Sequence, residues 1–235
     1  MTILRSLLFN FFLYTGITVV FLIALPSLFL PSKITLLFGK LLGHYVVLVV
    51  RIFLNTKVEF KGTENIPQNQ KYFVASAHQS MFETFALQSV LDYPVFILKK
   101  ELLKIPIFGW HLKKIGSISI DRDKVSKENL GFYDKIIIAT TKTKRPVIIF
   151  PQATRTEIGD RQSFKKGVSK IYEKLNFVCL PVALNSGNVW PKSGRLGSNK
   201  TITVSILKQI PAGLNSDDFL KNLEHELYCE LENIR

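Results

Sequence analysis

Hydrophobic residues fill positions 7–30 almost without interruption, in the run "LLFNFFLYTGITVVFLIALPSLFL". The run carries no charged side chain and is long enough to cross the hydrocarbon core of a bilayer. A cleaved signal peptide has a shorter apolar region and a small-residue cleavage site, and neither is evident here. We therefore expect a membrane segment. Asn10, Gly16 and Pro26 interrupt the run, which leaves open a helix that enters and returns through the same leaflet.

The next apolar stretch, residues 34–54, carries Lys40, His44 and Arg51 in an otherwise hydrophobic helical pattern. Such a helix can lie in the membrane interface with its basic groups toward the lipid headgroups. The alternative is a core helix that covers a sheet. On the first reading, residues 1–55 form N-terminal membrane-associated helices.

From residue 56 onward, short β-rich runs alternate with helical ones. The apolar runs predict strands at 57–62, 71–77, 94–98, 116–120, 145–150, 177–184 and 201–207. Helical spacing predicts helices at 81–92, 124–144 and 164–176, and a C-terminal helix with Ser216 as its N-cap. This alternation indicates a single layered α/β domain, residues 56–235, in which helices flank a mostly buried mixed sheet.

Composition narrows the class of protein. Of the 235 residues, 47% are hydrophobic and 21% charged, which argues against disorder and agrees with membrane contact. The net charge of +13 is spread along the chain and suits an anionic membrane surface, acidic substrates or nucleic acid. Cys179 and Cys229 lie far apart, with neither metal-ligand spacing nor a disulfide framework, so a reducing cytosolic environment is the simplest interpretation.

The stretch "SAHQSMFETFAL" places His78 at the end of a predicted strand and Glu83 at the start of a predicted helix. In one continuous helix the two side chains would point about 140° apart. A strand-to-helix turn with Ser80 as N-cap instead makes "SMFE" a capping box, in which the glutamate reaches back toward the preceding chain. Capping alone explains Glu83. The same conformation brings its carboxylate to His78, whose imidazole could then act as a general base.

Two arginines follow predicted strands elsewhere in the chain. Arg122 comes after "SISID", and Arg155 comes after "IIFPQAT". The guanidinium fork matches phosphate oxygens, so the pair could hold a phosphomonoester. The alternative is that each forms a surface ion pair with a neighbouring acid.

Four stretches in this order resemble the motifs of the PlsC-type 1-acylglycerol-3-phosphate acyltransferases. His78 and Glu83 resemble the family's His-X4-Asp motif, and "GSISIDR" at 116–122 is similar to the second motif, which ends in Ile-Asp-Arg. "FPQATR" at 150–155 resembles Phe-Pro-Glu-Gly-Thr-Arg, and "LPVAL" at 180–184 resembles the fourth, a hydrophobic strand around a proline.

The resemblance covers most of the chain, from about residue 57 to 192, and "KKELLKIPIFGW" also looks like the segment that leads into the second motif. It implies a glycerophosphate-acyltransferase-like fold and transfer of a fatty acyl group from acyl-CoA or acyl-acyl carrier protein to the sn-2 hydroxyl of lysophosphatidate, giving phosphatidate. His78 would be the base, and Glu83 would orient it. The implied substrate-binding residues are Lys99, Arg122, Gln152, Thr154 and Arg155. No metal or other cofactor is implied, and no nucleic-acid partner.

Two departures from the family pattern bear on the acceptor. Glu83 replaces the usual aspartate, which lengthens the carboxylate arm but keeps its charge. Gln152 and Ala153 replace Glu and Gly, which removes a charge and a flexible backbone position. The alternatives are therefore acyl transfer to another lysolipid, such as a lyso-aminolipid, or a non-catalytic basic protein that binds membrane or nucleic acid. Because the donors are cytosolic, we expect a membrane-associated protein with its active site on the cytoplasmic face of the inner (plasma) membrane.

Overall fold

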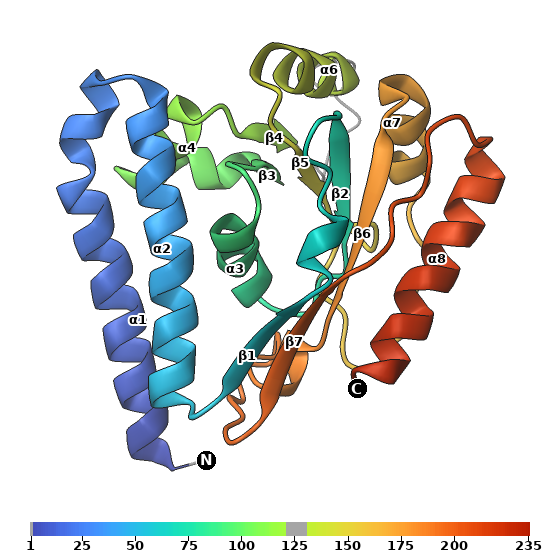
Figure 1. The fold of residues 1–235 in the computed structure, drawn as a ribbon. Coiled ribbons are helices and arrows are strands. Elements are labelled where there is room, and N and C mark those ends of the chain that lie inside the picture. The colour runs from blue at the N-terminus through green and yellow to red at the C-terminus, as the bar shows by residue number, and fades with distance from the viewer. Residues whose placement is uncertain (1, 121–130) are drawn as a thin grey trace.

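A mixed sheet lies between two layers of helices in the computed structural model, which describes residues 2–120 and 131–235 (Figure 1). Within these residues the strands are β1 (Lys57–Lys61), β2 (Tyr72–Ser76), β3 (Val95–Lys99), β4 (Ile118–Ile120), β5 (Val147–Ile149), β6 (Val178–Leu184) and β7 (Thr201–Ile206). Their order is β1-β7-β6-β2-β5-β3-β4. Only β6 and β7 pair antiparallel among these strands. Every predicted strand is confirmed.

The helices in the described residues are α1 (Ile3–Ile23), α2 (Ser32–Phe53), α3 (Phe82–Val90), α4 (Phe108–Lys114), α6 (Phe132–Thr143), α7 (Gly167–Leu175) and α8 (Ser216–Asn233). The sequence pattern did not predict α4, which spans two turns. Of the helix predicted at 124–144, residues 124–130 lie outside the described part of the chain. Ser216 is not the N-cap of α8; Asn215 is, because its side-chain oxygen accepts from the Asp218 N–H at 2.9 Å.

Each face of the sheet has its own hydrophobic core. On one face the sheet packs against α1, α2 and α3, with Val46, Phe82 and Leu87 fully buried. On the other face it packs against α6, α7 and α8, where the rings of Tyr172 and Phe219 stack at 3.9 Å. Because both faces are covered, the central strands read as continuous apolar runs rather than alternating ones.

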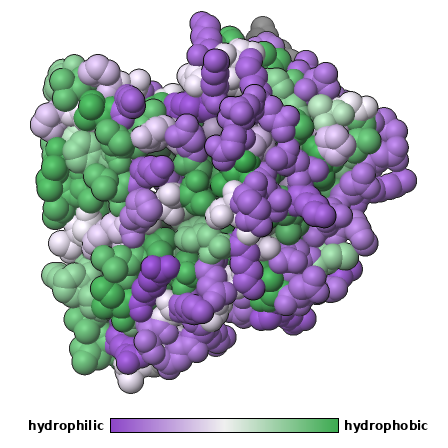
Figure 2. All heavy atoms as spheres, viewed as in Figure 1, coloured by the Kyte–Doolittle hydropathy of each residue, from purple (hydrophilic) through white to green (hydrophobic). Residues whose placement is uncertain are grey.

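The uncharged N-terminal run is not one helix. A short 3-10 helix, Leu25–Phe29, contains Pro26 and turns the chain, so that α1 and α2 lie side by side as an antiparallel pair (Figure 1). Both helices are long and apolar enough to cross a membrane by length and composition. Figure 2 shows hydrophobic surface gathered over this pair, while most of the remaining visible surface is hydrophilic. These features agree with membrane association.

The hairpin is held close to α3, the helix that begins just after His78. A Cβ atom on Gly43 of α2 would lie 2.7 Å from the Phe85 carbonyl oxygen and 3.0 Å from the Ser89 nitrogen. Only glycine permits this approach of two helix backbones. The membrane-type helices and the His78 turn therefore belong to one packed unit.

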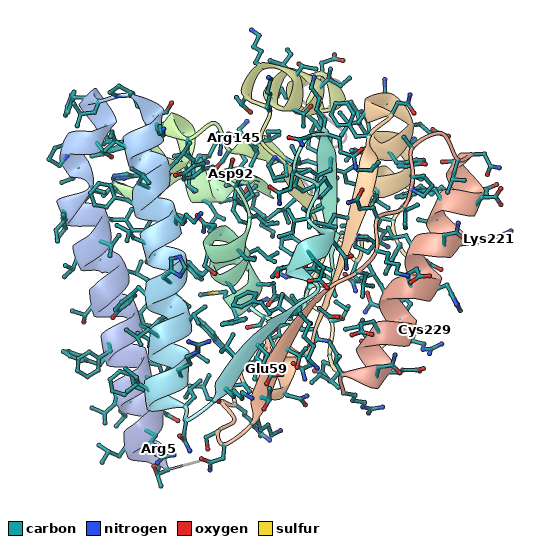
Figure 3. All side chains as sticks on the ribbon, in the orientation of Figure 1. Arg5, Glu59, Asp92, Arg145, Lys221 and Cys229 are labelled. Atoms are coloured by element: carbon teal, nitrogen blue, oxygen red, sulfur yellow. The ribbon has the colours of Figure 1, made fainter. Side chains whose placement is uncertain are left out.

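Arg145 connects several loops through hydrogen bonds at the amino-terminal end of β5. Its guanidinium donates to the carbonyl oxygens of Tyr93 at 2.5 Å, Ile115 at 2.7 Å and Pro94 at 3.2 Å. Burial lowers the pKa of Arg145 to about 10, and the nearby charge of Asp92, labelled with it in Figure 3, partly offsets that decrease. Since that pKa is still far above 7, the side chain is charged at neutral pH and anchors the end of α4.

Candidate active site

The candidate site lies at the carboxyl ends of three adjacent central strands, β5, β2 and β6. His78 follows β2 by two residues, Phe150 directly follows β5, and Ser186 follows β6 by two residues. The three strands run parallel, so their carboxyl ends meet at the same edge of the sheet. Such an edge is where open α/β sheets place their ligands.

His78 and Glu83 are in contact. The imidazole Nδ1 lies 3.0 Å from Glu83 Oε1, and the Glu83 side chain is fully buried while that of His78 is 17% exposed. The carboxylate also accepts from the backbone N–H groups of Gln79 at 2.6 Å and Ser80 at 2.7 Å. Because a carboxylate accepts, Nδ1 carries the imidazole proton, and the lone pair on Nε2 is left to take another. The predicted turn geometry is therefore observed.

The helix start differs by one residue from the prediction. Met81, not Ser80, is the N-cap of α3, and the Ser80 hydroxyl accepts from the Phe82 N–H at 3.0 Å. Glu83 still completes its half of the capping box through the Ser80 N–H. Capping and contact with His78 thus use the same carboxylate oxygen.

Ser186 supplies a hydrogen bond that the sequence did not predict. Its hydroxyl donates to Glu83 Oε2 at 2.8 Å, and the residue is fully buried. The two residues are 103 positions apart, so no local pattern joins them. Glu83 consequently accepts four hydrogen bonds, one from His78, two from backbone N–H groups and one from Ser186.

Replacing Ser186 with alanine should lower the free energy of unfolding by about 1–3 kcal/mol, because a buried carboxylate oxygen loses its donor. Chemical denaturation measures this change. Ser169→Ala is the matched control, since the Ser169 hydroxyl is also buried but donates to the neutral carbonyl of Lys166. Equal losses in the two variants would show that the hydrogen bond from Ser186 to Glu83 contributes no more to stability than the one from Ser169 to a neutral carbonyl.

The segment after β5 holds His78 from the other side. The rings of His78 and Phe150 stack with centroids 4.0 Å apart and an interplanar angle of 19°. The His78 carbonyl oxygen accepts from the N–H of Thr156 at 2.8 Å and from its hydroxyl at 3.2 Å. The chain from Phe150 to Thr156 therefore contacts both the ring and the backbone of His78.

The other predicted site residues occupy different environments. Arg155 is half-buried and adjoins Thr156, which places it beside the His78 turn. Thr154 is exposed, as is Lys99 at the end of β3 on the same sheet edge. Gln152 is only 1% exposed, so an acceptor would have to reach below the surface to touch it. Arg122 lies outside the described residues.

Ala153 keeps the backbone conformation that glycine favours. Its φ is +60°, in the left-handed region where a Cβ is crowded. Ala153→Gly should raise the free energy of unfolding by about 0.5–1 kcal/mol, because the relief of strain exceeds the added entropy of the unfolded chain. Ala139→Gly in the middle of α6 should lower it instead, by about 1 kcal/mol. A loss of stability in Ala153→Gly, measured by denaturation, would contradict this account.

An apolar cavity of about 180 Å³ lies between the helical hairpin and the sheet. Its lining comes from α1, α2, α3, β3 and α4 and includes Phe21, Phe38, Leu42, Phe96 and Phe108. Phe150 also lines it, and the ring of Phe150 is the one stacked on His78. The cavity and the histidine are therefore separated by a single aromatic side chain.

Other chemistry has little support at this edge. Burial raises the pKa of the Cys179 thiol well above its usual value, which makes it a poor nucleophile. Across residues 2–120 and 131–235, no group of three or more His, Cys, Asp or Glu side chains could hold a metal ion. The arrangement at His78 is suited to taking a proton from a bound hydroxyl or water.

A protein-family model described as Acyltransferase matches residues 57–185, which contain His78, Glu83 and the "FPQATR" segment. This chain belongs to the acyltransferase family. A 1-acyl-sn-glycerol-3-phosphate acyltransferase of Pseudomonas aeruginosa is 34% identical over 163 residues, covering 69% of this acyltransferase and 63% of the relative. A chloroplastic enzyme of the same name from Arabidopsis thaliana is 28% identical over 190 residues, covering 77% of this chain and 52% of its own.

The alignments thus span roughly half to two thirds of these curated relatives' lengths. Among solved structures, the 1-acyl-sn-glycerophosphate acyltransferase PlsC of Thermotoga maritima matches with a TM-score of 0.80 and 22% identity. That match covers 100% of this acyltransferase and 99% of the other chain, N-terminal helices included. It shows that the fold is shared over the whole length.

Proposed function

We propose that this acyltransferase moves a fatty acyl group from acyl-CoA or acyl-acyl carrier protein to the sn-2 hydroxyl of 1-acylglycerol-3-phosphate and so produces phosphatidate. The observation that carries the proposal is the His78–Glu83 contact of 3.0 Å at the carboxyl edge of the sheet. The names of the relatives support the choice of acceptor.

In the proposed reaction, His78 Nε2 removes the proton of the acceptor hydroxyl as its oxygen attacks the thioester carbonyl carbon. Glu83 holds the imidazole by Nδ1 and stabilises the imidazolium that forms. The tetrahedral intermediate collapses with cleavage of the carbon–sulfur bond. The departing thiolate then takes the proton from His78, which restores the neutral imidazole.

The apolar cavity is where we place the acyl chain of the donor. The reacting carbonyl is bonded directly to that chain, whereas the acceptor hydroxyl is separated from its own chain by the glycerol. Phe150 joins the cavity wall to His78, so a chain in the cavity would have its carboxyl end near the imidazole. A pocket lined mostly by hydrophobic and aromatic side chains suits such a ligand.

For the acceptor phosphate we propose Arg155, with Lys99 at the same edge of the sheet as a second cation, and with Thr154 and Gln152 nearer the glycerol. Arg122, which lies outside the described residues, is proposed as a third cation from the sequence motif alone. Among the described residues of this set, Lys99 and Thr154 are exposed. Arg155 is next to the residue that bonds to the His78 backbone, so a phosphate held there would lie a few atoms from the base.

Arg155→Ala should raise KM for lysophosphatidate by about 10- to 100-fold, the value of a lost charge-assisted bidentate contact, with a smaller effect on kcat. Initial rates over a range of acceptor concentrations measure it. Arg161→Ala is the matched control, because Arg161 lies in the same loop but pairs with Glu232. An unchanged KM in Arg155→Ala would remove Arg155 from the phosphate site.

We place the hairpin in the membrane and the active site at its cytoplasmic face, where the donors are. The exposed apolar side chains that would meet lipid include Phe11, Leu22, Leu41 and Leu48 of the hairpin and Trp110 of α4. Since the cavity is bounded by the hairpin and α4, a lipid chain could enter it from the bilayer side.

The direct test is acyl transfer from a labelled donor to lysophosphatidate by the purified protein in vesicles. Formation of labelled phosphatidate supports the proposal. The second candidate, motivated by the uncharged Gln152, is transfer to a phosphate-free lysolipid such as a lyso-aminolipid. Turnover of that acceptor but not of lysophosphatidate would replace the first proposal with the second. If neither acceptor is acylated by the folded protein, the assignment of an acyltransferase activity is wrong.

A further inference from the structure

One residue of the largely apolar cavity lining has a buried polar atom without a hydrogen-bond partner. His111 of α4 lines the cavity and is 3% exposed. Its Nε2 is buried and makes no hydrogen bond. The residues that line the cavity all belong to the described part of the chain, and none of the others has a buried side-chain nitrogen or oxygen without a hydrogen-bond partner. The hydroxyls of Thr35 and Thr84, also in the lining, bond to Ser27 and Met81.

The backbone fixes which nitrogen of His111 carries the proton. Nδ1 lies 2.8 Å from the Ile107 carbonyl oxygen. A carbonyl oxygen can only accept, so Nδ1 of the neutral ring is the donor and Nε2 has a free lone pair. The unsatisfied group of this lining residue is thus an acceptor, and its partner must be a donor.

This arrangement rests on strained backbone. Ile107 has φ +62° and ψ −61°, an unfavourable conformation for a β-branched residue. It directs the Ile107 carbonyl toward both the backbone N–H of His111, at 3.1 Å, and the ring Nδ1. Phe21 then packs edge-on against the imidazole, with centroids 5.2 Å apart. Strain of this kind persists only where the surrounding structure enforces it, and it is concentrated at ligand sites.

We propose that the cavity selects an acyl chain that bears a hydroxyl group, which donates a hydrogen bond to His111 Nε2. The proposal rests on the proposed function only in taking the occupant to be an acyl chain. An unsubstituted chain would leave the buried lone pair unpaired, whereas a hydroxylated chain at the right depth satisfies it. A site built around a hydrogen bond discriminates strongly against the analogue that lacks the partner.

The experiment is displacement of a fluorescent fatty acid from the full-length protein in detergent. The competitors are an unsubstituted saturated fatty acid and a series of the same length with one hydroxyl moved along the chain. For the isomer whose hydroxyl reaches His111, wild type should bind about tenfold more tightly than it binds the unsubstituted acid, as expected for one buried hydrogen bond.

Two variants separate the hydrogen bond from packing. His111→Phe keeps a flat ring beside Phe21 but has no acceptor, so the preference should fall to about onefold while the unsubstituted acid binds at least as well as before. Phe21→Leu changes the same wall without touching a polar atom, and should shift the binding of both acids equally. The proposal is overturned if wild type prefers no isomer, as it would with a water on Nε2, or if the preference survives in His111→Phe.

Failure of the proposed function would look different. A hydroxyl preference in binding, together with no transfer from any acyl donor, would retain the His111 site and reject the reaction. Transfer of unsubstituted chains without any hydroxyl preference would retain the reaction and reject the site. If the reaction and the His111 site are both correct, the ratio of kcat/KM for the hydroxylated and unsubstituted donors should follow the ratio of their binding affinities. His111→Phe should then abolish the preference for the hydroxylated donor.

Discussion

His78→Ala should lower kcat for acyl transfer by about 10²- to 10⁴-fold, the usual contribution of a positioned general base. The loss should appear in kcat rather than in KM for the acceptor, because the substituted group acts on the reacting proton and Arg155 is left in place. Steady-state rates with labelled donor measure it. Folding should be little affected, since the His78 ring reaches the surface and the backbone bonds from Thr156 to its carbonyl do not depend on the side chain.

His225→Ala is the matched control for this experiment. His225 lies exposed on α8, beside the free Cys229, and should tolerate alanine without loss of rate. If His78→Ala kept more than a tenth of the wild-type kcat while the protein remained folded, His78 would not be the base. The imidazole would then have a structural role, packing against the ring of Phe150.

Much of this fold could be predicted from the sequence because the sheet is buried on both faces. Continuous apolar runs marked the central strands, and the change from helical to strand periodicity near residue 56 marked the end of the N-terminal helices. Element ends were harder to predict. The N-caps of α3 and α8 each differ by one residue from the prediction, since polar residues adjacent to a helix end compete for the same backbone donors.

The contact between His78 and Glu83 was predictable because it is local, through a turn and a capping box. The residues that surround this contact could not be predicted from the sequence. Ser186 reaches Glu83 from the segment just after β6, and Phe150 stacks on His78 from the segment just after β5. Both contacts depend on the strand order, which no single-sequence pattern encodes. His111 is similar, since its unpaired nitrogen is recognisable only once the cavity is formed.

Ala153 departs from the family motif, and its left-handed backbone shows that the fold accommodates the replacement of glycine. The expected effect of replacing glycine was a loss of flexibility at the acceptor site. The structure instead has a positive φ at this alanine, so the conformation that glycine favours is adopted at the cost of strain.

Glu83→Gln should reduce kcat by about 10²-fold or more, since the amide cannot stabilise the imidazolium as a carboxylate does. Glutamine is the informative replacement because it keeps the shape of the side chain. Its oxygen can still accept from Gln79 and Ser80, whereas alanine would leave four donors, three of them buried, without their partner and confuse catalysis with unfolding. The measurement is kcat alongside the free energy of unfolding for each variant.

Glu83→Asp is the partner experiment, because it keeps the charge and removes one methylene. The shorter arm cannot hold Oε1 on His78 and the two backbone N–H groups while its other oxygen stays 2.8 Å from the Ser186 hydroxyl, so we expect a smaller loss of kcat, about tenfold. This order, with aspartate retaining more activity than glutamine, follows if charge beside the imidazole matters more than exact reach. The reverse order would mean that Glu83 serves mainly to shape the turn, and that His78 works without an ionised partner.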